Sequence, residues 1–305
     1  MKKIKGRIIS LLTVTALIAT GTVPQAFAEA GKESSTTKVI TDYSSTEQNT
    51  EEQVYITGEV EDLRTKYSKT YEQSDGNMAA VVSAAPIHFY DEEKETWEEY
   101  DNRLAYNEET ENYESDENGS DMQVSLPKKI DEENGIEVEA EGYKVSITPM
   151  DMKSSYSKKT NEKKNVKSSS EKSLKEYSLE DYVSDSVLDG KVEYIQDESS
   201  KIEYIFSGSG LKENIVLSEV PENEQTYSFK IKADGLTAKL KKDNTIKLLD
   251  KDKKAVFVIP APYMYDSDFA FSDEVETTLK KEGKEYILTY APDHEWLADK
   301  ERAYP

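Results

Sequence analysis

Apolar and polar residues alternate at every second position in many short segments of this chain. The alternation is clearest in residues 136–140, 143–147, 191–195 and 201–206, where one face of each strand is predicted to be buried and the other to face water. The other predicted strands are residues 79–82, 86–90, 97–100, 122–126, 211–217, 227–231, 237–240, 245–248, 255–259, 275–279 and 285–290. The pattern predicts a mainly β protein, an antiparallel β-sandwich built as one large unit or as two lobes.

One strand departs from the alternation because all of its central residues are apolar. Residues 256–259 are β-branched or aromatic, and the run is too short for an ordinary helix, so it is predicted as a strand buried on both faces. Pro260 and Pro262 are expected to end its ladder, since proline has no backbone N–H to donate. Near the C-terminus, residues 292–297 are predicted to form a single helical turn with acidic residues at its start.

The N-terminus has the three parts of a secretory signal peptide. Four of the first seven residues are basic, residues 8–18 are largely apolar, and Ala26 and Ala28 are small residues at the positions that a signal peptidase reads. The alternative is a membrane anchor, but this apolar segment is too short to span a bilayer. We therefore predict that residues 1–28 are a signal peptide cleaved after Ala28, and that the chain meets a membrane only through this segment before cleavage.

The rest of the chain divides by composition into four segments. Residues 29–54 are rich in Ser, Thr and Glu and are predicted to form a disordered spacer. Residues 55–150 form a predicted β-rich lobe, and residues 179–305 form a predicted β-sandwich lobe that is expected to be truncated at its C-terminal end. The Lys- and Ser-rich stretch 151–178 is predicted as a loop or linker. It either separates two lobes or is an insertion at a hairpin tip of one continuous sandwich.

Charge and cysteine content narrow the class of protein. The chain has 62 acidic and 39 basic residues, a net charge of −23, and removal of the signal peptide takes away only basic residues. Such a surface argues against partners with phosphates, so we expect neither nucleic acid nor anionic lipid to bind. The absence of cysteine excludes disulfides and thiol chemistry. Together with the signal peptide, this composition is typical of an acidic bacterial protein that is secreted or cell-wall-associated.

Candidates for catalysis are few. His88 and His294 are the two side chains able to act as general bases at neutral pH, and neither lies near a nucleophilic serine motif. Carboxylate pairs are uninformative, because a chain with 62 acidic residues offers many by chance. The sequence therefore predicts that the chain is not an enzyme, and it names no catalytic residue.

Candidates for binding are equally weak. The acidic stretches 116–121 and 250–252 suggest calcium loops, but neither has the ligand spacing of one, so both are interpreted as plain turns. Trp97 and Trp296 could stack on sugars, although spaced aromatics on strands more often belong to a core. We name no cofactor, no cofactor-binding residue and no metal-binding residue.

The chain resembles the N-terminal region of large secreted Gram-positive proteins that carry a DNRLRE-type domain followed by YD (Rhs-type) repeats. Bacillus wall-associated proteins of the contact-dependent toxin class are among them. The resemblance covers about residues 60–305 without the Lys- and Ser-rich stretch, and the matching segments are 86–90, 97–104, 256–265, 286–293, 296–297 and 302–305. It implies that the polypeptide continues into another strand and the DNRLRE module, so the chain is expected to be a fragment. No catalytic residue of the family maps onto it.

The resemblance and the export signal lead to one main hypothesis and two alternatives. The main hypothesis is a secreted, non-catalytic β-sandwich module of a cell-wall-associated YD-repeat protein, acting as a surface scaffold or attachment region. The first alternative is a carbohydrate-binding module for wall glycans, and the second is a secreted hydrolase. The expected partners are cell-wall glycans or other surface proteins.

Overall fold

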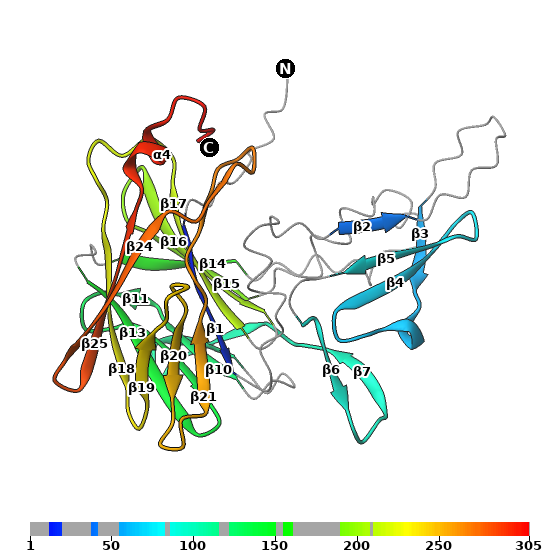
Figure 1. Cartoon of the computed structure of the whole chain (residues 1–305). Helices are drawn as coiled ribbons and strands as arrows, with labels where there is room; N and C mark the ends of the chain where they lie inside the picture. Colours follow the sequence, from blue (N-terminus) through cyan, green and yellow to red (C-terminus); the bar gives the residue numbers. More distant parts are fainter. Residues whose placement is uncertain are drawn as a thin grey trace.

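The protein is an antiparallel β-sandwich with a smaller β region beside it (Figure 1). The computed structural model describes residues 12–19, 38–41, 55–82, 86–115, 122–150, 155–160, 190–207 and 210–304. Every strand pairing between these residues is antiparallel. The predicted fold class, a mainly β antiparallel sandwich, is confirmed.

The first layer of the sandwich is an eight-stranded sheet in the order β24-β25-β18-β13-β12-β10-β9-β8. Its strands are β8 (Leu104–Asn107), β9 (Asn112–Ser115), β10 (Gln123–Pro127), β12 (Ile136–Ala140), β13 (Tyr143–Met150), β18 (Tyr227–Ala233), β24 (Val275–Glu282) and β25 (Glu285–Pro292). Most of these strands show the predicted alternation, and β25 is buried at every second residue.

The second layer is a nine-stranded sheet in the order β11-β14-β15-β16-β17-β1-β21-β20-β19. Its strands are β1 (Leu12–Ala19), β11 (Lys129–Ile130), β14 (Ser155–Thr160), β15 (Lys191–Ile195), β16 (Ser200–Ser207), β17 (Gly210–Leu217), β19 (Thr237–Leu240), β20 (Ile246–Leu249) and β21 (Ala255–Ile259). Residues 256–259 of β21 are all buried, so the predicted strand with two buried faces is confirmed.

The core lies between these two sheets and is rich in aromatic side chains. Tyr204 and Phe257 of one sheet and Phe229 and Tyr290 of the other are at most 3% exposed and belong to one continuous apolar cluster. The edge-to-face contact of Phe229 with Tyr290, with ring centroids 6.2 Å apart, is typical of aromatic packing in such a core. Burial of these apolar side chains stabilises the sandwich, which has no disulfide bond.

The smaller region contains two further sheets, which come between β1 and β8 in the chain and lie to the right in Figure 1. One has the order β2-β5-β4-β3, and the other is the β6–β7 hairpin. Their strands are β2 (Lys38–Thr41), β3 (Ile56–Glu59), β4 (Ser68–Gln73), β5 (Met78–Val82), β6 (His88–Asp91) and β7 (Thr96–Glu99), and the short helix η1 (Glu61–Leu63) follows β3. Ile56, Tyr71 and Ala79 are buried in the four-stranded sheet.

A short strand pair and one helix complete the described structure. β22 (Met264–Tyr265) pairs with β23 (Phe271–Ser272), and α4 (His294–Ala298) follows β25. The predicted helical turn is confirmed, with Asp293 as its N-cap accepting a hydrogen bond from the backbone N–H of Trp296 at 3.0 Å. Within the described residues, no helix has the length and apolar character needed to cross a membrane.

The structure differs from the sequence predictions where strands occur in segments expected to lack them. The predicted spacer contains β2, which pairs with β5, and the predicted loop 151–178 contains β14, which pairs with β15. Residues 39 and 40 are β-branched, and both segments gain backbone partners only from distant strands, which local propensity does not reveal.

One strand pair also joins the two predicted lobes. β13 and β18 lie on opposite sides of the Lys- and Ser-rich stretch, yet they are neighbours in the eight-stranded sheet from Val145↔Ala233 to Met150↔Ser228. Strands from both predicted lobes therefore contribute to one sandwich, as in the alternative of an insertion at a hairpin tip. The domain boundaries themselves stay a prediction.

Candidate functional site

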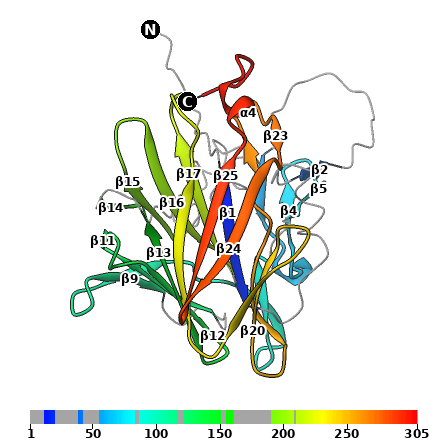
Figure 2. The same cartoon turned by 60° about the vertical axis from the view of Figure 1, so that its left-hand side comes forward.

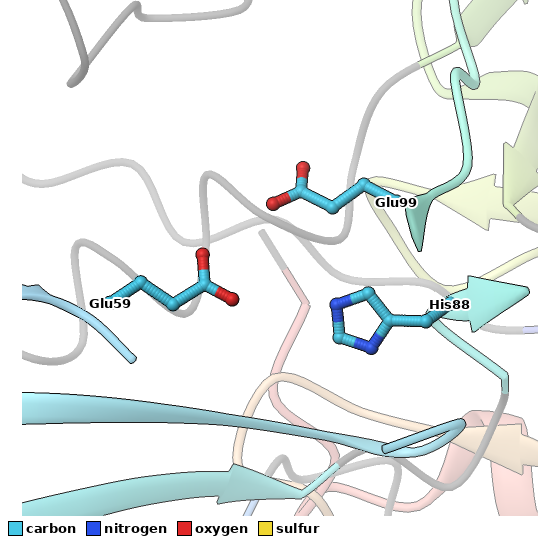
Figure 3. Close-up of side chains that lie close together, drawn as sticks. All are labelled: Glu59, His88 and Glu99. Carbon is cyan, nitrogen blue, oxygen red and sulfur yellow. The ribbon is translucent and has the colours of Figure 1, made fainter. Parts of the chain in front are cut away.

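A buried histidine and two glutamates point toward one another in the smaller β region (Figure 3). Glu59 ends β3, His88 begins β6 and Glu99 ends β7, so three strands each contribute one side chain. One ligand-type atom from each residue lies within 4.8 Å of the others. We call these three residues the Glu–His–Glu centre.

Two basic side chains neutralise the carboxylates of this centre. Arg64 donates from Nε to Glu59 Oε1 at 2.7 Å and from Nη2 to Glu59 Oε2 at 3.1 Å. The same Nη2 reaches Glu99 Oε1 at 3.2 Å, and Lys69 Nζ donates to that oxygen at 2.9 Å. Burial by itself would lower the pKa of Arg64, but the hydrogen bond and charge of Glu59 outweigh it, so the pKa is raised. The centre is therefore a partly buried network of opposite charges, with the exposed Glu61 at its margin, 3.5 Å from Arg64 Nη2.

His88 enters this network as a neutral side chain. Its Nδ1 lies 2.6 Å from the carbonyl oxygen of Thr65, and because a carbonyl can only accept, Nδ1 carries the proton. The Nε2 lone pair is buried and has no hydrogen-bond partner among the described residues. Burial lowers the pKa of His88, and the charges of Lys69 and Arg64 lower it further. His88 is therefore held neutral with a free acceptor nitrogen.

These ligand types are those that zinc prefers, but the charges oppose a metal ion. An imidazole nitrogen and two carboxylates could form three sides of a zinc site. Arg64 and Lys69 already place two positive charges on the two carboxylates, and the guanidinium occupies both oxygens of Glu59. A divalent cation would first have to displace Arg64. We therefore interpret the centre as an ion-pair network that joins the four-stranded sheet to the β6–β7 hairpin.

The network orients a hairpin that carries aromatic side chains. Arg64 donates from Nη1 to the carbonyl oxygen of Trp97 at 3.4 Å, which ties β7 to the turn after η1. Within the hairpin, Trp97 is the cross-strand partner of Tyr90, and their ring centroids are 5.3 Å apart. Tyr90 is 44% exposed and Trp97 is half-buried. The centre thus fixes the position of a partly exposed aromatic pair, which we call the Tyr90–Trp97 pair.

The structure separates the other residues considered from the sequence. His294 lies in α4, on the sandwich, and not near His88. Asp250 Oδ1 accepts hydrogen bonds from the backbone N–H groups of Asp252 and Lys254 at 2.9 and 2.8 Å, so this acidic stretch is a turn, as interpreted. Trp296 packs on the core beneath the guanidinium of Arg302. The stretch 116–121 lies outside the described residues.

Sequence reasoning missed four of the five residues that build the network. The sequence singles out His88 as one of two histidines, but it gives no such signal for Glu59, Arg64, Lys69 and Glu99. With 62 acidic residues in the chain, no single glutamate stands out. The available signal was indirect, because a histidine in a buried strand must find polar partners from some other segment.

Comparisons with known proteins place the chain beside wall-associated proteins. No family model and no solved structure matches it. The tRNA nuclease WapA of Bacillus subtilis (strain 168) is 28% identical over 267 residues, which is 81% of this chain and 10% of that protein. The tRNA3(Ser)-specific nuclease WapA of Bacillus spizizenii matches with the same identity and coverage. The Wall-associated protein of Geobacillus stearothermophilus is 24% identical over 211 residues, covering 69% of this chain and 76% of that protein.

These relatives confirm one prediction and contradict another. The chain is homologous to wall-associated proteins, and it is secreted or cell-wall-associated, as predicted. The prediction that the chain is not an enzyme is wrong, because the Bacillus relatives are named as nucleases that act on tRNA. The chain spans about 10% of the length of these nucleases.

Proposed function

We propose that this chain is the wall-attachment region of a secreted, WapA-like tRNA nuclease. The observation that carries the proposal is the similarity itself, which extends over 81% of the chain and includes relatives named both for the wall and for tRNA cleavage. In this proposal, residues 1–28 direct export, and the longer polypeptide also carries the DNRLRE-type domain and the YD repeats. The β-sandwich then holds that polypeptide at the cell surface.

The negative charge of the chain supports the proposal that this region attaches to the wall and that another region of the longer protein binds tRNA. Binding to tRNA requires basic groups against the phosphates, and this chain has a net charge of −23. It would contribute little affinity for RNA. Its sandwich has one continuous apolar core, which suits a structural role at the cell surface.

The test is attachment to isolated cell walls. The purified full chain is incubated with Gram-positive cell-wall sacculi, which are pelleted, washed in high salt and assayed for bound protein. We expect the chain to sediment with the sacculi and an unrelated acidic β-protein of similar charge to stay in solution. If both proteins stay in solution at all salt concentrations, the attachment role is refuted.

A second candidate function, direct binding of wall glycans, is favoured by the Tyr90–Trp97 pair. Aromatic faces stack on the apolar C–H faces of sugar rings, and this pair is partly exposed on a hairpin that Arg64 holds in place. The test compares Tyr90→Ala/Trp97→Ala with Tyr106→Ala/Tyr113→Ala, which removes another cross-strand aromatic pair, with ring centroids 5.2 Å apart. We expect at least a tenfold loss of binding to soluble peptidoglycan fragments for the first variant only. Equal binding by both variants would exclude the hairpin as the glycan site.

A further inference from the structure

The strand β1 occupies a central position in the nine-stranded sheet, between β17 and β21, and Figure 2 shows it in the middle of the sandwich. It pairs antiparallel with β17 from Leu12↔Ile215 to Ile18↔Gly210, and with β21 at Ile18↔Val258 and Ala19↔Phe257. In the strand order of the sheet, β17 and β21 are not neighbours, so β1 joins its two halves. Figure 1 shows β1 in dark blue within the sandwich.

Both flanking strands have the character of interior strands. In β21, residues 256–259 are buried on both faces and none is charged. In β17, residues 213–217 are also buried without a break, although this strand includes Lys212 and Glu213. Exposing the edge of a buried strand is costly because its N–H and C=O groups lose their partners. Each of these edges therefore requires an occupant.

The flanking strands are unable to close the gap between them. Because β1 is antiparallel to both, β17 and β21 run parallel to each other. Adjacent strands are about 4.8 Å apart, so direct pairing would move one half of the sheet by about that distance. Phe257 and Ile259 of β21 are packed against the opposite sheet within one apolar cluster, and such a shift would break that packing.

The segment that fills the gap is also the segment that the sequence predicts to be removed on export. Residues 12–19 lie inside the predicted signal peptide 1–28. We propose that the position between β17 and β21 is a strand-acceptor site, which β1 fills in the precursor and which, after removal of β1, binds an extended apolar segment of about eight residues from another polypeptide. Backbone pairing on both edges would supply the affinity, as in other strand-addition complexes.

The register can be tested directly because the chain has no cysteine. Thr13 and Asn214 are backbone partners, so we expect the Thr13→Cys/Asn214→Cys full chain to form an intramolecular disulfide on mild oxidation. The control Thr13→Cys/Lys212→Cys is out of register, since Lys212 pairs with Ala16, and it should stay reduced. Equal crosslinking of both variants, or of neither, would overturn the placement of β1.

The acceptor property is tested in the folded full chain carrying a specific protease site after Ala28. After cleavage, we expect the fragment 1–28 to co-elute with the rest of the chain in gel filtration, and a labelled synthetic peptide of residues 8–20 to exchange into its place. A labelled peptide with Ala16→Pro and Leu17→Pro should bind at least tenfold more weakly, because proline removes ladder N–H groups. Equal binding of both peptides, or immediate loss of the fragment with unchanged thermal stability and no peptide uptake, would refute the acceptor site.

Discussion

Glu213 offers the sharpest test of how the sandwich core works, because a carboxyl group lies in its interior. Glu213 is 4% exposed, and its side chain lines a small cavity between the two sheets together with Tyr204, Phe229 and Leu288. Within the described structure, its Oε1 has no hydrogen-bond partner. Burial raises the pKa of Glu213 from 4.5 to about 8, although the hydroxyl of Tyr204 opposes the shift. At neutral pH the side chain is therefore protonated.

The raised pKa converts into a stability difference that depends on pH. Between pH 4.5 and 8 the folded state binds the proton more tightly than the unfolded state, so stability falls as the pH rises. Each pKa unit corresponds to about 1.4 kcal/mol, so the whole interval amounts to about 5 kcal/mol. The loss begins near pH 4.5 and is complete above about pH 8.

The perturbation is Glu213→Gln, which keeps the shape of the protonated acid and removes its titration. We expect this variant to match the wild-type full chain within about 1 kcal/mol at pH 4.5 and to exceed it by about 5 kcal/mol at pH 9. Urea unfolding at several pH values measures the free energy of unfolding of both proteins. The contributions of the other titrating groups cancel in the difference between the two values. The control is Glu137→Gln, an exposed carboxylate on β12 paired with Lys144. A difference that stays flat from pH 4.5 to 9 would refute the buried, protonated state of Glu213.

Three further predictions concern the smaller region and one glycine of the sandwich. Because the pKa of His88 is lowered from 6.5, wild type should lose stability as the pH falls below 6.5, and His88→Phe should lose less over the same range in urea unfolding. Arg64→Met should unpair the partly buried carboxylate of Glu59 and lower stability by about 1–3 kcal/mol, read from the thermal transition; an unchanged transition would contradict the network. Gly190→Ala should cost about 1–3 kcal/mol more than Gly142→Ala, because both have positive φ but only the Cβ at 190 would overlap a carbonyl oxygen, that of Asn102.

Much of the fold could be predicted from local pattern. The two-residue alternation in β12 and β25 depends only on how successive side chains point to opposite faces, so it is visible in the sequence without knowledge of partners. The run of apolar residues in β21 likewise indicated an interior strand, and burial confirmed it. The weak alternation of β8 and β9 gave no such signal, and these strands are recognisable only through their pairing.

The candidate site could not be predicted in the same way. The network of Arg64, Glu59 and Glu99 forms only when charged side chains up to 40 residues apart in the sequence come together. A chain with 62 acidic residues contains many equivalent candidates for such contacts. The fold decides which charges interact, because the turn after η1 brings Arg64 into contact with the hairpin at the carbonyl oxygen of Trp97. Burial then strengthens the ion pairs that form there.

By itself, the sequence determined that this protein is a β-sandwich with an acidic surface, because strand periodicity and net charge are properties of consecutive residues and of composition. Only the tertiary structure decided that β13 pairs with β18 in one sheet, that His88 stays neutral between two glutamates, and that β1 fills the gap between β17 and β21. The physical reason is the same in all three cases. Backbone pairing and desolvation act between segments far apart in the chain, and their energies depend on which partners the fold brings together.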